Sequence, residues 1–82
     1  MTFYPEQCRA ARGLLNWTQD HLAAVSGVSR STIKDFECLR HSLHRSSEVL
    51  LVDTFQSNGV SFFVESDDVM GVRLRGARKA IL

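Results

Sequence analysis

The chain has 82 residues, of which 44% are hydrophobic and 23% are charged, and its formal net charge at pH 7 is +1. These values are typical of one small globular domain and exclude a strongly basic protein. No apolar run approaches the roughly 18 residues of a membrane span, and the N-terminus lacks a basic-then-apolar leader. We therefore expect a cytoplasmic protein with no membrane partner.

Positive charge is concentrated in one stretch of the chain. Between residues 30 and 45 the acidic residues are Asp35 and Glu37, and the basic residues are Arg30, Lys34, Arg40 and Arg45. The resulting positive potential is local and modest. It permits contact with phosphate groups.

Catalytic and metal-binding patterns are weak. The sequence shows no nucleophile paired with a base, so we expect no enzyme activity. Cys38, His41 and His44 have a C-x2-H-x2-H spacing, but three ligands in one loop with no fourth nearby make a poor zinc site. We therefore expect no metal and no cofactor. Cys8 and Cys38 are predicted to be reduced thiols, with Cys8 buried on an apolar helix side.

A first helix is predicted over residues 5–15. Pro5 is tolerated at the first helical position, and the acidic Glu6 is favoured near the N-terminal end of a helix. The apolar positions repeat with helical spacing: Cys8, Ala11, Leu14 and Leu15. Arg12 lies close to this apolar edge and is expected to need a partner.

Two short helices follow over about 19–25 and 30–38, joined by a tight turn at Gly27, where a residue with positive φ can end the first of them. The hydroxyl groups of Thr18 and Ser29 can cap the two helices. The expected inward residues are Leu22, Ala23, Val25, Ile33, Phe36 and Glu37. The expected outward residues include Arg30, Ser31 and Lys34.

A fourth helix is predicted over about 44–57 and ends before Asn58 and Gly59. Its apolar residues fall on more than one side of the helix: Val49, Leu50, Leu51, Val52 and Phe55. A helix that is apolar on several sides is usually buried, which predicts a central position in the fold.

After residue 59 the apolar residues alternate, which predicts a β-hairpin with strands over about 60–65 and 70–75. The turn is expected to use Ser66, Asp67, Asp68 and Gly71. An isolated hairpin is marginally stable, so it must pack on a helix or pair with another sheet. We expect a helical unit over 1–59, a hairpin over 60–75 in the same fold unit, and a loosely ordered tail over 76–82.

The helical segments resemble the Cro/CI-type helix-turn-helix regulators, also called the xenobiotic-response-element family. The matching positions are Gln19, Leu22, Ala23, Gly27, Val28, Ile33 and Phe36. The resemblance extends upstream through EQCRAARGLLNWTQ and downstream to GVRLR, so it covers most of the chain. It implies a mainly α fold, namely a four-to-five-helix, lambda-repressor-like helix-turn-helix domain followed by a C-terminal β-hairpin.

Three positions depart from the family pattern, and one of them is Ser26, which is polar where a small apolar residue is commoner. Leu39 stands where the family usually has glycine after the third helix, and Leu43 stands where it usually has proline before the fourth. The loop over 38–44 is therefore expected to have a different shape.

The resemblance implies a sequence-specific DNA-binding transcriptional regulator, and favours a repressor. It would bind double-stranded DNA as a homodimer with the helix over 30–38 in the major groove. The candidate DNA-binding residues are Gln19, Ser29, Arg30, Ser31, Thr32, Lys34, Arg40 and Arg45. Arg12 and Glu37 match a family pair that forms an internal salt bridge.

The hairpin leaves two interpretations open. It either covers the fourth helix as a flap, or pairs with the hairpin of a second copy to form the dimer. The residues assigned to the dimer interface are Phe62, Phe63, Val64, Val72 and Leu74. The rival function is a protein-interaction module or antitoxin that retains the helix-turn-helix fold and binds a protein partner.

Overall fold

The computed structural model describes residues 3–66 and 69–76. Its elements along the chain are α1 (Pro5–Leu15), α2 (Gln19–Ser26), α3 (Arg30–Glu37), α4 (Arg45–Ser57), β1 (Val60–Ser66) and β2 (Val69–Leu74). The described part is mainly α, with four helices followed by a two-stranded antiparallel hairpin, and this confirms the predicted fold class. None of the described helices has the length and apolar character needed to span a membrane.

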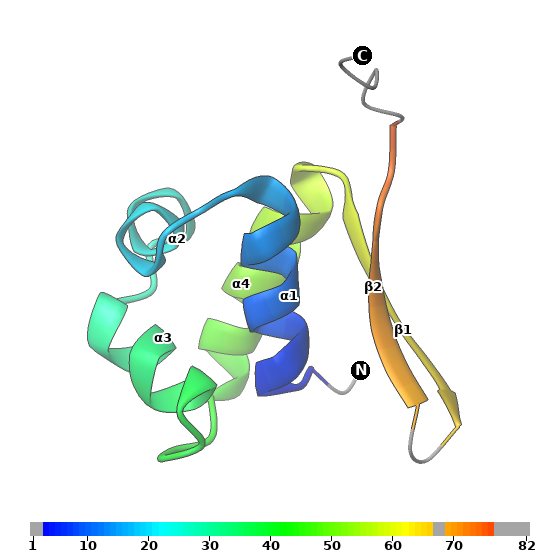
Figure 1. Cartoon of the computed structure of the whole chain (residues 1–82). Helices are drawn as coiled ribbons and strands as arrows, with labels where there is room; N and C mark the ends of the chain where they lie inside the picture. Colours follow the sequence, from blue (N-terminus) through cyan, green and yellow to red (C-terminus); the bar gives the residue numbers. More distant parts are fainter. Residues whose placement is uncertain (1–2, 67–68, 77–82) are drawn as a thin grey trace.

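The hairpin and the α2–α3 unit lie on opposite sides of α1 and α4 (Figure 1). β2 contacts α1, β1 contacts α4, and α3 contacts both α1 and α2. Residues 77–82 of the predicted tail lie outside the described residues, as do Asp67 and Asp68 of the predicted turn. The arrangement leaves α3 uncovered by the hairpin.

The ends of α2 and α3 are set by local chemistry. Thr18 Oγ1 accepts a hydrogen bond from the backbone N–H of His21 at 3.0 Å, which caps the start of α2. Gly27 ends α2 with a φ of 80°, a conformation that glycine adopts without a steric penalty. Ser29 Oγ accepts from the backbone N–H of Thr32 at 3.2 Å and caps α3. These caps and the turn at Gly27 are as predicted.

The core draws residues from every helix and from the hairpin. Its fully buried side chains include Leu22 of α2, Ile33 of α3, Phe55 of α4 and Val60 of β1. Trp17 stacks on Phe55 with 6.0 Å between ring centroids. Burial of this many apolar side chains from separate segments is the main source of the stability of the fold.

The structure corrects two predictions about burial. Val25 was predicted to face inward, but 47% of it is exposed. The fourth helix was predicted to be central, yet Val49 and Leu50 are each 46% exposed and only one side of α4 is buried, through Leu51, Val52 and Phe55. α4 does lie between α2 and β1 and contacts both, but these contacts leave Val49 and Leu50 each 46% exposed.

The hairpin pairs Val60 with Leu74, Phe62 with Val72 and Phe63 with Gly71. Gly71 was predicted to be a turn residue, and this is wrong because it lies within β2. The ring of Phe63 covers Gly71 so closely that an added Cβ would overlap it. The guanidinium of Arg73 lies 4.2 Å from the centre of the same ring. Only glycine at position 71 leaves room for the ring of Phe63 on the neighbouring strand.

Gln7 attaches the hairpin to α1. Its Oε1 accepts from the backbone N–H of Tyr4 at 3.0 Å, which helps to cap the start of the helix. Its Nε2 donates to the carbonyl oxygens of Phe63 at 3.2 Å and Gly71 at 3.1 Å, one on each strand. Only 2% of Gln7 is exposed, so these bonds satisfy an amide that water does not reach.

Candidate nucleic-acid interface

The two sides of α3 differ sharply in chemistry. Ile33, Phe36 and Glu37 are buried, whereas the exposed side carries a short polar and basic row: Arg30, Ser31 and Lys34. This division follows helical periodicity, because residues three and four apart share a side. The predicted outward residues are thus gathered on one uncovered helix side.

Hydroxyl groups cluster at the N-terminal end of α3. Ser29 Oγ donates to Thr32 Oγ1 at 2.8 Å and lies 3.3 Å from Ser31 Oγ. Ser29 and Ser31 are exposed, whereas Thr32 is half-buried. The hydroxyl of Ser29 is therefore used first as a helix cap, and any contact to a ligand must share it with that role.

Arg30 forms an exposed ion pair that the sequence analysis missed. Its Nε lies 2.9 Å from Oδ1 of Asp20, in the first turn of α2. The two side chains are 58% and 77% exposed. The opposite charges were visible in the sequence, but their proximity depends on the packing of α2 against α3 and has no local sequence signal.

Arg12 and Glu37, the pair linked by the family resemblance, lie in direct contact. Arg12 Nη2 is 2.6 Å from Glu37 Oε1, and Arg12 Nε donates to Oε2 at 2.8 Å. The carboxylate also accepts from Cys8 Sγ at 3.0 Å and from Gln19 Nε2 at 3.1 Å. Burial alone would raise the pKa of Glu37, but hydrogen bonds from Arg12, Cys8 and Gln19 outweigh it and hold the pKa below its ordinary value.

Gln19 differs from its predicted role as a phosphate contact. Its side-chain amide is half-buried and turns inward to Glu37, where it donates one of the four hydrogen bonds to the carboxylate. Gln19 is nevertheless the first residue of α2, so its backbone N–H lies at the helix N-terminus. The side chain braces α2 against α3 in this structure.

The basic residues that follow α3, in the loop and at the start of α4, are on the surface. Arg40 and Arg45 are exposed, and the backbone N–H of Arg40 closes the loop by donating to the carbonyl of Asp35 at 2.8 Å. Leu39 has a φ of 64°, the left-handed conformation usual for glycine, and is 71% exposed. Leu39 therefore holds a backbone conformation that is strained for a residue with a side chain.

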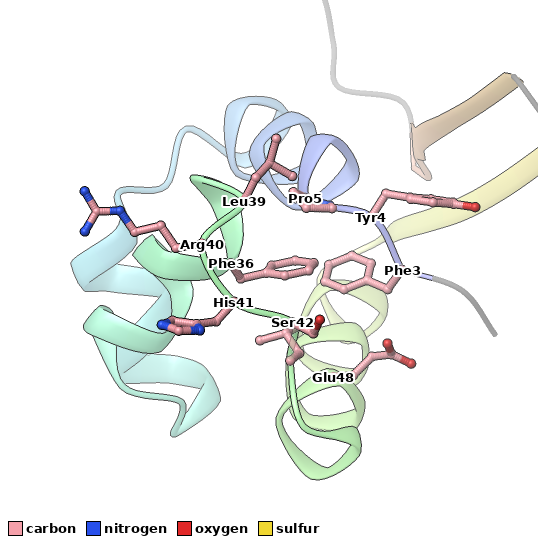
Figure 2. Close-up of a pocket in the computed structure, with 10 residues that line it drawn as sticks. Phe3, Tyr4, Pro5, Phe36, Leu39, Arg40, His41, Ser42 and Glu48 are labelled. Carbon is pink, nitrogen blue, oxygen red and sulfur yellow. The ribbon is translucent and has the colours of Figure 1, made fainter.

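A hollow of about 380 Å³ separates this loop from the N-terminal segment and the start of α4. Figure 2 shows the rings of Phe3 and Phe36 facing each other in it, while Arg40 points away from them. These rings stack with 5.6 Å between their centroids. The guanidinium of Arg40 therefore lies on the outer side of the loop.

The predicted dimer residues fall into two groups. Phe62, Val72 and Leu74 are half-buried and pack against the core of the same chain. Phe63 lies on the opposite face of the hairpin, half-buried beneath Arg73. Val64 is exposed, and so are two residues that the prediction omitted, Val69 and Met70. The exposed apolar part of the hairpin is thus its turn end, which we define as Val64, Val69 and Met70.

Among the described residues, no three histidine, cysteine, aspartate or glutamate side chains are grouped to hold a metal ion. Comparison of the chain with models of known protein families and with curated protein sequences gives no match.

Proposed function

We propose that this chain is a sequence-specific DNA-binding regulator of transcription in the cytoplasm, with α3 as its recognition helix. The observation that carries the proposal is the uncovered polar side of α3, with Arg30, Ser31 and Lys34 opposite a buried apolar side. The major groove of B-form DNA admits one α-helix, and arginine near its start can donate to both O6 and N7 of guanine.

Contacts to the DNA backbone would come from the flanks of α3. Arg40, in the loop that follows α3, and Arg45, the first residue of α4, are both exposed. The free backbone N–H groups at the start of α2 supply a second set of donors for phosphate oxygens. Because each phosphate neutralised by these contacts releases counterions, binding should weaken steeply as the salt concentration rises.

A homodimer fits this geometry, because one helix-turn-helix makes few contacts and two copies can bind successive turns of the major groove. The turn end of the hairpin presents Val64, Val69 and Met70. The hairpin and α3 lie on opposite sides of α1 and α4 (Figure 1), so a contact between two hairpins leaves both recognition helices uncovered. We assign the dimer contact to this turn end and to the neighbouring strand edges, because Phe62, Val72 and Leu74 already pack within one chain.

The test is selection of binding sites from random duplex DNA, followed by titration of the selected duplex. Arg30→Ala should reduce specific affinity by about tenfold or more, since it removes a bidentate base contact. The matched control is Arg75→Ala, which removes the same charge from an exposed position after β2. Circular dichroism should show the same fold for both variants, and unchanged affinity of Arg30→Ala would contradict the proposal.

A second candidate is a protein-interaction module or antitoxin, favoured by the exposed apolar residues and the low net charge. Leu39 is 71% exposed and the hairpin carries Val64, Val69 and Met70 at its turn end. Titration with mixed genomic duplex DNA at low salt separates the candidates. Absence of binding at micromolar protein would favour the interaction module.

A further inference from the structure

We propose that Asp20 is a positioning residue for the DNA interface, which orients Arg30 toward a guanine and so sharpens sequence specificity. The inference rests on the proposed function. It adds a residue of α2 that was absent from the predicted contact set, and it assigns a base preference to the start of α3.

The ion pair joins the two helices of the helix-turn-helix on their solvent side. Arg30 is the first residue of α3 and Asp20 the second residue of α2, and their Nε and Oδ1 atoms lie 2.9 Å apart. With side chains 58% and 77% exposed, the pair is one of the surface ion pairs that contribute little to folding stability. Its effect lies in where it holds the guanidinium.

The geometry decides which donors remain for a base. A guanidinium carries five N–H donors in a rigid plane, and the Asp20 carboxylate lies beside Nε of that plane. The two terminal nitrogens, Nη1 and Nη2, lie at the far end of that plane and match the spacing of O6 and N7 on guanine. A held arginine also loses less side-chain freedom on binding than a mobile one. Asp20 therefore favours an end-on, two-bond contact to guanine.

The carboxylate has an opposite effect on binding that does not depend on sequence. Its negative charge lies beside the surface that would approach phosphates, so it weakens binding to every duplex alike. Removing Asp20 is therefore expected to leave the affinity for unrelated DNA unchanged or to raise it. The ratio of specific to non-specific affinity is expected to fall. A role in folding alone would not produce this divergence.

The experiment repeats the selection from random duplex DNA with four proteins: wild type, Asp20→Ala, Asp20→Asn and Arg30→Ala. Asp53→Asn is the matched control, because it removes an exposed carboxylate from α4. Titrations of the selected duplex and of an unrelated duplex then give the specificity ratio. Urea unfolding of each variant verifies that the fold is retained.

For Asp20→Ala we expect the specificity ratio to fall by about five- to tenfold, within the range for one base contact. The preference for guanine should weaken at one position in each half-site. Arg30→Ala should weaken the preference at the same position. Replacing that guanine with 7-deazaguanine, which lacks the N7 acceptor, should cost wild type more affinity than it costs Asp20→Ala. Asp20→Asn should fall between wild type and Asp20→Ala.

Two results would overturn the inference, and they differ from each other. If wild type selects a consensus and Asp20→Ala selects the same one with equal sharpness at every position, Asp20 does not position Arg30 while the proposed function stands. If wild type selects no consensus, the proposed function fails, and the role of Asp20 fails with it.

Discussion

Cys8 and Glu37 form a buried hydrogen bond between α1 and α3, with 3.0 Å between Sγ and Oε2. Burial, the hydrogen bond to Glu37 and its negative charge together raise the pKa of the Cys8 thiol, so it stays protonated and donates. Arg12 and Gln19 donate to the same carboxylate, which joins α1, α2 and α3 at one charged group. Glu37 therefore ties α3 to both α1 and α2.

Loss of Arg12 should destabilise the fold strongly. Arg12→Ala leaves the Glu37 carboxylate buried without its cation, and we expect the free energy of unfolding to fall by about 3 kcal/mol. Urea denaturation measures the change. Arg9→Ala is the matched control, because Arg9 donates to the backbone carbonyl of Glu37 and not to the carboxylate, and it should cost less than about 1 kcal/mol. Equal losses for both variants would show that the carboxylate does not depend on Arg12.

Glu37 should make the protein sensitive to acid. Its pKa is lower in the folded than in the unfolded state, so its contribution to stability is fully present above its ordinary pKa of about 4.3. The contribution is lost as the pH falls through the folded value, because protonation then favours the unfolded chain. Glu37→Gln should be less stable than wild type at pH 7 and should lose less further stability between pH 5 and 2, as measured by urea denaturation across that range. Glu65→Gln controls for net charge, and an unaltered pH slope in Glu37→Gln would contradict the prediction.

Leu39→Gly should stabilise the protein. Leucine at a φ of 64° carries backbone strain that glycine relieves, and a side chain that is 71% exposed loses little packing when removed. The greater freedom of glycine in the unfolded chain offsets part of the gain, so we expect about 0.5–1 kcal/mol. Asn16→Gly, at a φ of 58°, should gain less because asparagine tolerates this conformation. A loss of stability in Leu39→Gly, measured by thermal unfolding, would mean that the leucine packs more tightly than its exposure indicates.

Gly71→Ala should destabilise the hairpin by about 1–2 kcal/mol, because the new methyl group displaces the ring of Phe63. The displaced ring also loses its contact with Arg73. A double-mutant cycle with Phe63→Ala isolates the effect, since the methyl group meets no ring in the double variant. The double variant should therefore lose less than the sum of the single losses. If the two single losses of stability simply add, the cost of Gly71→Ala does not come from contact with the Phe63 ring.

Features that depend on near neighbours in the chain could be predicted from the sequence. Thr18 and Ser29 bond to backbone groups three residues away, and Gly27 ends a helix through its own backbone conformation. Each of these signals lies within one helical turn. The alternating residues after position 59 likewise predict a hairpin without reference to the rest of the fold.

Features that depend on the packing of separate segments could not be predicted. Gln19 and Asp20 are adjacent polar residues, yet one turns inward to Glu37 and the other pairs with Arg30 at the surface. The orientation of α2 against α1 and α3 decides which of the two side chains is turned inward. In the same way, glycine is common in turns, so Gly71 was predicted to be a turn residue. The strand needs glycine there because the ring of Phe63 lies across it.

Gln7 and Arg12 link the hairpin to α3 through α1. The side-chain oxygen of Gln7 accepts a hydrogen bond at the start of α1, and its side-chain nitrogen donates to one carbonyl on each hairpin strand. Arg12, also in α1, forms a salt bridge with Glu37 of α3. Movement of the hairpin would therefore be passed through α1 to Glu37 at the end of α3, and also to α4, which β1 contacts. In the homodimer that we propose, α1 and α4 would fix the separation between the two copies of α3.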